Sequence, residues 1–138
     1  MSVRRDSSDE KWQELKARVR KRDQGHDRIL RVLSMKEALL LQRLAPRTQL
    51  QKLDCAHIHA VGVHPRLCYV DANVVLLNRY SHENLDNMRH PIDGSPITME
   101  ENLLWWQRIL GDVQWKTLER VKHKQEDVLD EYSCKLES

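Results

Sequence analysis

Two strand-forming runs followed by a helix are the feature that most constrains how this chain folds. Residues 52–60 and 74–77 are predicted to be strands, with residues 67–70 as an alternative start for the second one. A loop containing Gly and Pro separates them, and residues 81–89 are predicted to form a helix. The order strand, strand, helix predicts a small α+β unit in the middle of the chain.

The remaining segments are predicted to be helical, because signals for helix starts and ends recur along them. Ser34 with Glu37, and Thr98 with Glu101, have the spacing of capping boxes, in which each side chain bonds the other residue's backbone amide. Gly111 is predicted to close the helix that Thr98 opens. Helices are expected over residues 9–22, 34–44, 98–110 and 113–132, whereas residues 26–33 fit a short strand or a helical turn. The expected fold class is therefore α+β, mostly helical, with flanking N- and C-terminal helices.

Length and hydropathy limit the class of protein. The chain has 138 residues, the length of one domain with helical extensions. No apolar run reaches the roughly 18–20 residues of a membrane span. Residues 1–8 are polar, lack the apolar core of a signal peptide and are expected to be disordered. We therefore expect a soluble, intracellular protein with no membrane partner.

Positive charge is concentrated near the N-terminus, although the net charge of the chain is only +2. Residues 16–22 carry five cationic side chains. Such a block neutralises phosphates, although a solvated helix face is the alternative interpretation. The candidate nucleic-acid contacts are Lys16, Arg18, Arg20, Lys21, Arg22 and, in the loop between the strands, Arg66.

His57, Asn73 and His82 follow one another along the two predicted strands and the helix. Within the segments KLDCAHIHAVG and DANVVLLNRYSHENLD, they resemble the motif of the HNH endonuclease family, over about residues 50–90. The resemblance implies a ββα-metal core and a DNA endonuclease that hydrolyses phosphodiester bonds with one divalent metal ion. Mg²⁺ or Mn²⁺ is the expected ion, with Zn²⁺ or Ni²⁺ as alternatives. Small members of this kind resemble bacteriophage proteins, which implies the cytoplasm of a bacterial host.

The resemblance also implies a role for each motif residue. His57 is the expected general base, because a neutral imidazole accepts a proton near pH 7. His82 is the expected metal ligand. The amide of Asn73 is expected to pin the loop between the strands and so to orient His57. His59, on the same strand face as His57, is expected to contact phosphate or to be exposed.

Two departures from the family pattern stand out. Many members place a metal ligand immediately before the base, where this chain has Ala56. Asp54, on the same strand face as Ala56, and Asp86, one helical turn after His82, are the candidate replacements. Many members also hold the hairpin with a zinc ribbon, but the three cysteines of this chain have no C-x-x-C spacing. Packing alone must then hold the hairpin.

The organisation that follows has an HNH nuclease domain with an N-terminal basic helix over residues 9–111 and a C-terminal helix over residues 112–138. One basic helix and a loop grip phosphates without reading bases, which predicts low sequence specificity. The rival hypothesis is a non-catalytic nucleic-acid-binding or protein-interaction module with a degenerate HNH core. Ala56 and the missing zinc cysteines favour the rival, whereas the strand, strand, helix order favours the nuclease.

Overall fold

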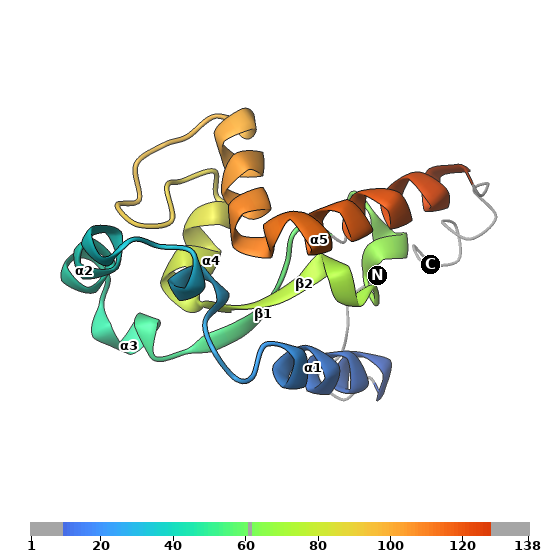
Figure 1. Cartoon of the computed structure of the whole chain (residues 1–138), viewed down its shortest axis with the longest axis horizontal. Coiled ribbons are helices and arrows are strands. Elements are labelled where there is room, and N and C mark those ends of the chain that lie inside the picture. The colour runs from blue at the N-terminus through green and yellow to red at the C-terminus, as the bar shows by residue number, and fades with distance from the viewer. Residues whose placement is uncertain (1–9, 61, 128–138) are drawn as a thin grey trace.

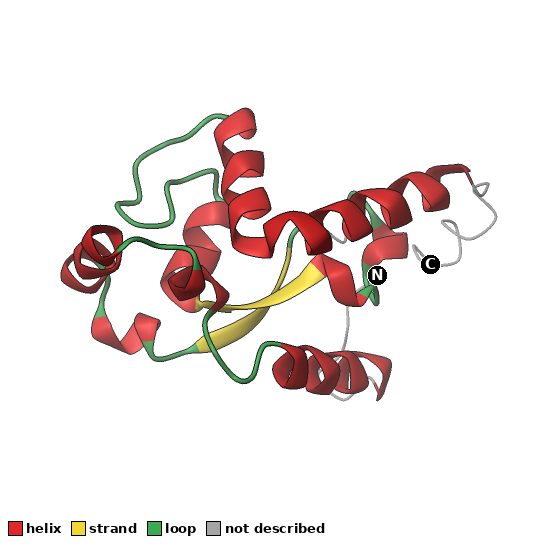
Figure 2. Ribbon diagram, viewed as in Figure 1, coloured by secondary structure: helices red, strands yellow, loops and turns green. Residues whose placement is uncertain are grey.

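Helices surround a small sheet in the computed structural model, which describes residues 10–60 and 62–127 (Figure 1). Most of this part is helical, and a two-stranded antiparallel sheet lies in its middle (Figure 2). The predicted α+β, mostly helical class is confirmed. The disorder expected for residues 1–8, and the last residues of the predicted C-terminal helix, lie outside the described residues. No helix of the described part is long and apolar enough to cross a membrane.

The sheet is a hairpin of two short strands. β1 (Leu53–His57) pairs with β2 (Val74–Asn78), so that Leu53 lies opposite Asn78 and His57 opposite Val74. Every residue of β2 is buried. A two-stranded hairpin is at best marginally stable alone in water. The stability of this hairpin therefore depends on the helices that cover it.

Helices cover both faces of the hairpin (Figure 1). On one face lies α1 (Glu10–Arg22), whose buried Leu15 and Val19 pack against β2. On the other face lie α4 (Arg79–Asp86) and α5 (Met99–Asp127). The core on that second face includes Ala56, Ile58, Val75, Leu77, Leu85, Trp106, Ile109 and Leu118. The sheet is thus the middle layer between α1 and the other helices.

Both predicted capping boxes are present. Before α2 (Met35–Leu44), the Ser34 hydroxyl accepts from the Glu37 backbone N–H, and the Glu37 carboxylate accepts from the Ser34 backbone N–H. The same reciprocal pair joins Thr98 and Glu101 at the start of α5. These local signals therefore predicted the two helix starts correctly.

Gly111 separates two helical halves of α5, because its backbone angles (φ 79°, ψ 165°) are not helical. Its φ of 79° lies in the left-handed region, which glycine adopts without strain. The predicted helix end at Gly111 is confirmed: two helices meet there at a kink, and the second one continues within the described part. Leu118, beyond the bend, belongs to the same core as Ile109.

The hairpin is shorter than predicted. β1 ends at His57 and not at residue 60, because the backbone of His59 is bonded by the side chain of Asn73 and not by a second strand. Residues 67–70 continue from a 3-10 helix into a turn and form no strand. The shorter helical elements are η1 (Arg28–Arg31), α3 (Arg47–Leu50), η2 (Pro65–Leu67) and η3 (Asp71–Asn73). The segment 26–33 therefore contains a helical turn, not a strand.

Candidate active site

The side chain of Asn73 ties together the two ends of the loop between β1 and β2. Asn73 is fully buried, and its Oδ1 accepts from the His59 backbone N–H at 2.8 Å. Its Nδ2 donates to the backbone oxygens of His59, at 3.1 Å, and Leu67, at 3.2 Å. These contacts are the ones that pinning the loop requires.

His57 lies at the end of β1 and is bonded by the same loop. Its Nε2 is 3.0 Å from the backbone oxygen of Cys68, the residue after Leu67. A carbonyl oxygen only accepts, so Nε2 carries the hydrogen, and in the neutral ring Nδ1 carries the lone pair. The loop that Asn73 pins therefore sets the tautomer of His57.

The ring of His57 also stacks on a side chain of α1. The ring centroids of His57 and Trp12 are 5.3 Å apart, and the ring planes differ by 16°. An in-plane hydrogen bond to Cys68 and a stacked indole together fix the imidazole in both direction and tilt. Helical spacing places Trp12 on the packing face of α1, and nothing in the sequence indicates this stacking.

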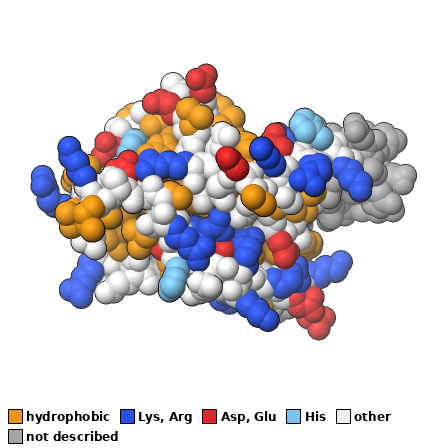
Figure 3. Space-filling model, in the orientation of Figure 1, with side chains coloured by type: hydrophobic (Ala, Val, Ile, Leu, Met, Phe, Trp, Pro, Cys, Tyr) orange, Lys and Arg blue, Asp and Glu red, His pale blue; other side chains and the backbone are white. Residues whose placement is uncertain are grey.

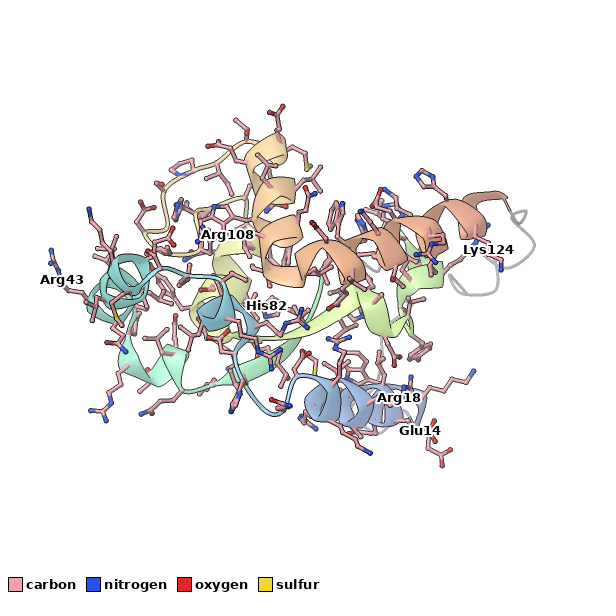
Figure 4. The ribbon with its side chains drawn as sticks, in the orientation of Figure 1. Glu14, Arg18, Arg43, His82, Arg108 and Lys124 are labelled. Atoms are coloured by element: carbon pink, nitrogen blue, oxygen red, sulfur yellow. The ribbon has the colours of Figure 1, made fainter. Side chains whose placement is uncertain are left out.

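His82 lies on α4 and is labelled in Figure 4. Two carboxylates flank its ring. Its Nδ1 is 2.9 Å from Asp54 Oδ2, and its Nε2 is 3.1 Å from Asp86 Oδ2. Arg79 Nη2 lies 2.9 Å from the second oxygen of Asp54. The structure thus brings both candidate carboxylates to His82.

These contacts change the pKa values of the cluster. Burial alone would lower the pKa of His82, but the hydrogen bonds to Asp86 and Asp54 raise it above its usual value. Burial alone would raise the pKa of Asp54, but hydrogen bonds from Arg79 and His82 hold the pKa below its usual range. The raised pKa of His82 and the lowered pKa of Asp54 both favour the charged forms, an imidazolium beside a carboxylate.

The same cluster can be tested for its fit to a metal ion. Asp54 and Asp86 bond different nitrogens of the His82 ring. Among the described residues, no group of three His, Cys, Asp or Glu side chains is arranged to hold an ion. Each ring nitrogen forms one pair of ligands with its neighbouring carboxylate: His82 Nε2 with Asp86, or His82 Nδ1 with Asp54. Mg²⁺ is usually bound through one or two carboxylates together with waters and substrate phosphates. The donor set therefore fits an ion of this kind once His82 has lost its proton, because only the neutral imidazole has a lone pair for a metal, with phosphate completing the set.

His57 and His82 lie on different sides of β1. Asp54 and Ala56 point to the face that α4 and α5 cover, and His57 points to the α1 face, as the alternation of a strand requires. Ala56 is fully buried and packs in the core. The position where a ligand was expected is thus filled by packing, and Asp54 is the acid nearest to it on that face of β1.

The basic block of α1 divides into two groups. Arg18 pairs with Asp71, and Arg22 donates to Asp23 and to the backbone oxygens of Asp71 and Val74. Both arginines were predicted to contact nucleic acid, but they bond within the protein because α1 packs on the start of β2.

The other predicted nucleic-acid contacts are arranged differently. Arg20 and Lys21 are exposed. Lys16 lies over the Trp12 ring, with Nζ 5.6 Å from the ring centroid. Arg66 is half-buried in η2. Lys and Arg side chains are spread over the face shown in Figure 3. Arg20 and Lys21 are the members of the block best placed to meet phosphate.

His59 is buried, contrary to the alternative that it is exposed. Its side chain is only 10% exposed, and its Nε2 lies 3.8 Å from Glu119 Oε2 of α5. Burial is the main cause that lowers its pKa. The ring also meets His64 edge-on and lies near Trp115. His57 and His59 therefore each face a tryptophan, one on α1 and one on α5.

No family model, curated protein or solved structure matches this chain. The chemistry of the site therefore rests on the contacts described above.

Proposed function

We propose that the protein is a metal-dependent DNA endonuclease of the HNH type, which hydrolyses phosphodiester bonds. The observation that carries the proposal is the bond between His57 Nε2 and the Cys68 carbonyl, in a loop that Asn73 pins. That bond leaves the ring lone pair on Nδ1, which is the atom that a general base uses. The resemblance of His57, Asn73 and His82 to the HNH motif supports the same function.

Each residue then has one task. His57 Nδ1 takes the proton of the attacking water, and Trp12 keeps its ring in place. Asn73 holds the loop whose carbonyl orients His57. His82 with Asp86, or with Asp54, would hold the divalent ion, Mg²⁺ or Mn²⁺. When bound, such an ion polarises the phosphate and stabilises the leaving oxygen as a Lewis acid.

The substrate proposed is DNA bound with low sequence specificity. Arg20 and Lys21 are exposed on α1 and supply charge for phosphates, which carry no sequence information. The biological setting proposed is bacteriophage DNA processing in the cytoplasm of a bacterial host.

A second candidate is a non-catalytic nucleic-acid-binding or protein-interaction module with a degenerate HNH core. The observation that favours it is the placement of His57 and His82 on opposite faces of β1, with Trp12 stacked on His57. A single phosphodiester would have to reach both side chains for hydrolysis to occur.

Plasmid nicking separates the two candidates. Supercoiled DNA is incubated with the full chain and Mg²⁺, Mn²⁺, Zn²⁺ or Ni²⁺ in turn. The wild type and a His26→Ala control, altered at an exposed loop histidine, are expected to nick, and His57→Ala is expected not to. His82→Ala is expected to lose both nicking and the binding of the same ion measured by calorimetry. Intact plasmid with wild type in all four metals would overturn the nuclease.

A further inference from the structure

α1 makes a dense set of polar contacts with the segment that carries Asn73. The Arg18 guanidinium forms a two-point pair with Asp71: Nε lies 3.0 Å from Oδ2 and Nη2 lies 2.9 Å from Oδ1. Arg22 donates from Nη1 to the Asp71 backbone oxygen at 2.8 Å, and from Nη2 to that of Val74. Figure 4 shows Arg18 on the side of α1 towards the hairpin. These bonds hold the backbone on both sides of Asn73.

α5 holds the same segment from the opposite side. Gln114 Nε2 donates to the backbone oxygen of Ala72 at 3.0 Å. The carbonyls of residues 71, 72 and 74 are therefore all bonded by side chains of the two flanking helices. Asn73 sits at the centre of this arrangement, which fixes the direction of its amide.

α1 also places Trp12 on the ring of His57. Trp12, Leu15 and Val19 lie on one face of the helix, and the last two are buried against β2. One rigid helix therefore contacts both His57 and the segment of Asn73.

We infer that α1 is a positioning element of the active site: Trp12 holds the His57 ring, and Arg18 with Arg22 holds the segment of Asn73. This inference rests on the proposed function. It reassigns the two arginines from nucleic-acid contacts to positioning residues. The exposed Arg20 and Lys21 remain the phosphate contacts of the helix.

Loss of the Arg18–Asp71 pair should affect the stability of the fold much less than the rate of the reaction. The side chains of Arg18 and Asp71 are 50% and 46% exposed, and ion pairs this exposed contribute at most about 1 kcal/mol to stability. Catalysis is more sensitive, because a displacement of about 1 Å can lower a rate about 100-fold. Loss of this pair should leave the fold intact and slow the reaction.

A charge reversal tests the arginine pair in the full chain. Arg18→Asp and Asp71→Arg are each expected to lower kcat about tenfold, with KM for plasmid DNA much less affected. The double variant should recover most of kcat, because the pair is restored with its charges exchanged. Arg20→Gln should instead raise KM and flatten the dependence of binding on salt, as a lost phosphate contact does. Glu10→Gln, at an exposed residue in the first turn of α1, is the matched control with unchanged kinetics.

The stacking is tested by a spectroscopic readout that needs no activity. The ¹⁵N signals of the His57 ring report which nitrogen carries the hydrogen. Trp12→Phe keeps an aromatic ring and should preserve the Nε2–H pattern, whereas Trp12→Leu should shift it towards a mixture of tautomers and lower kcat.

Two results would overturn the inference. One is Arg18→Asp behaving as Arg20→Gln does, with no recovery in the double variant. The other is Trp12→Leu leaving the His57 signals unchanged. If the wild type fails to nick DNA in any metal, the proposed function falls, and the ring signals still decide whether α1 orients His57.

Discussion

Replacing Asn73 by Ala should destabilise the protein, because the backbone N–H and C=O of His59 lose their partner at once, whereas the C=O of Leu67 still accepts from the Val70 N–H. The N–H and C=O of His59 and the C=O of Leu67 are bonded by this side chain, which has no exposed surface. A buried polar group left unsatisfied costs about 1–3 kcal/mol. The lower figure for each of the two His59 groups gives a loss of about 2 kcal/mol, a large share of the about 5–15 kcal/mol typical of a domain.

Urea unfolding followed by tryptophan fluorescence measures this loss, since the chain has four Trp. The midpoint should fall with the slope unchanged. Asn87→Ala is the control, because Asn87 is exposed and its Nδ2 bonds only the Glu83 carbonyl, and its effect should stay within about 0.5 kcal/mol. The Asn73→Asp variant keeps the oxygen that accepts from the His59 N–H but loses both donors of the amide group. Hydrogen exchange at the His59 N–H should therefore stay slow in the Asn73→Asp variant and become fast in the Asn73→Ala variant. A loss below about 1 kcal/mol for Asn73→Ala would refute the counting of unsatisfied groups.

Two further predictions concern the helices around the site. Hydrogen bonds from Arg108, and then from the Ser34 backbone, lower the pKa of Glu37 from 4.5 to about 2. Its contribution to stability is therefore complete above about pH 4.5 and is lost as the pH falls towards 2, so Glu37→Gln should flatten this part of the curve of melting temperature against pH. Gly111→Ala should lower the stability in thermal unfolding by about 1–3 kcal/mol, because its φ of 79° and ψ of 165° lie in a region that only glycine adopts without strain. The backbone angles alone cause this loss, since the added Cβ would meet no atom within 4 Å. Val113→Ala, altered at a side chain that is 82% exposed, should melt as the wild type does, and an equal drop in both variants would contradict the backbone explanation.

The parts of the fold that the sequence predicts well depend on neighbouring residues. The capping boxes at Ser34 and Thr98 act over three residues, and they located the starts of α2 and α5. Gly111 lies between the two helices that the sequence predicts, and its backbone angles are not helical. No local pattern reveals that Leu118, in the second of these helices, packs in the same core as Ile109.

In the site, too, local spacing predicts some contacts, and contacts between distant segments cannot be predicted from it. Strand alternation placed Asp54 opposite to His57, and the spacing of one helical turn placed Asp86 beside His82. The pairing of Arg18 with Asp71 spans 53 residues, so it needs the packing of α1 on the hairpin to be known. A cation in a basic block and a cation in an internal pair look alike in sequence. Only the position of the partner carboxylate distinguishes them.

The burial of all of β2 has a practical consequence for attempts to reduce or transplant the site. A peptide of residues 53–86 would contain His57, Asn73, His82 and both candidate carboxylates, yet one face of its hairpin would lack α1 and the other would keep α4 without α5. Such a peptide is not expected to fold, since neither a zinc ribbon nor a third strand would replace the missing cover. The smallest transferable unit therefore runs from α1 to the bend of α5 and beyond it to Leu118.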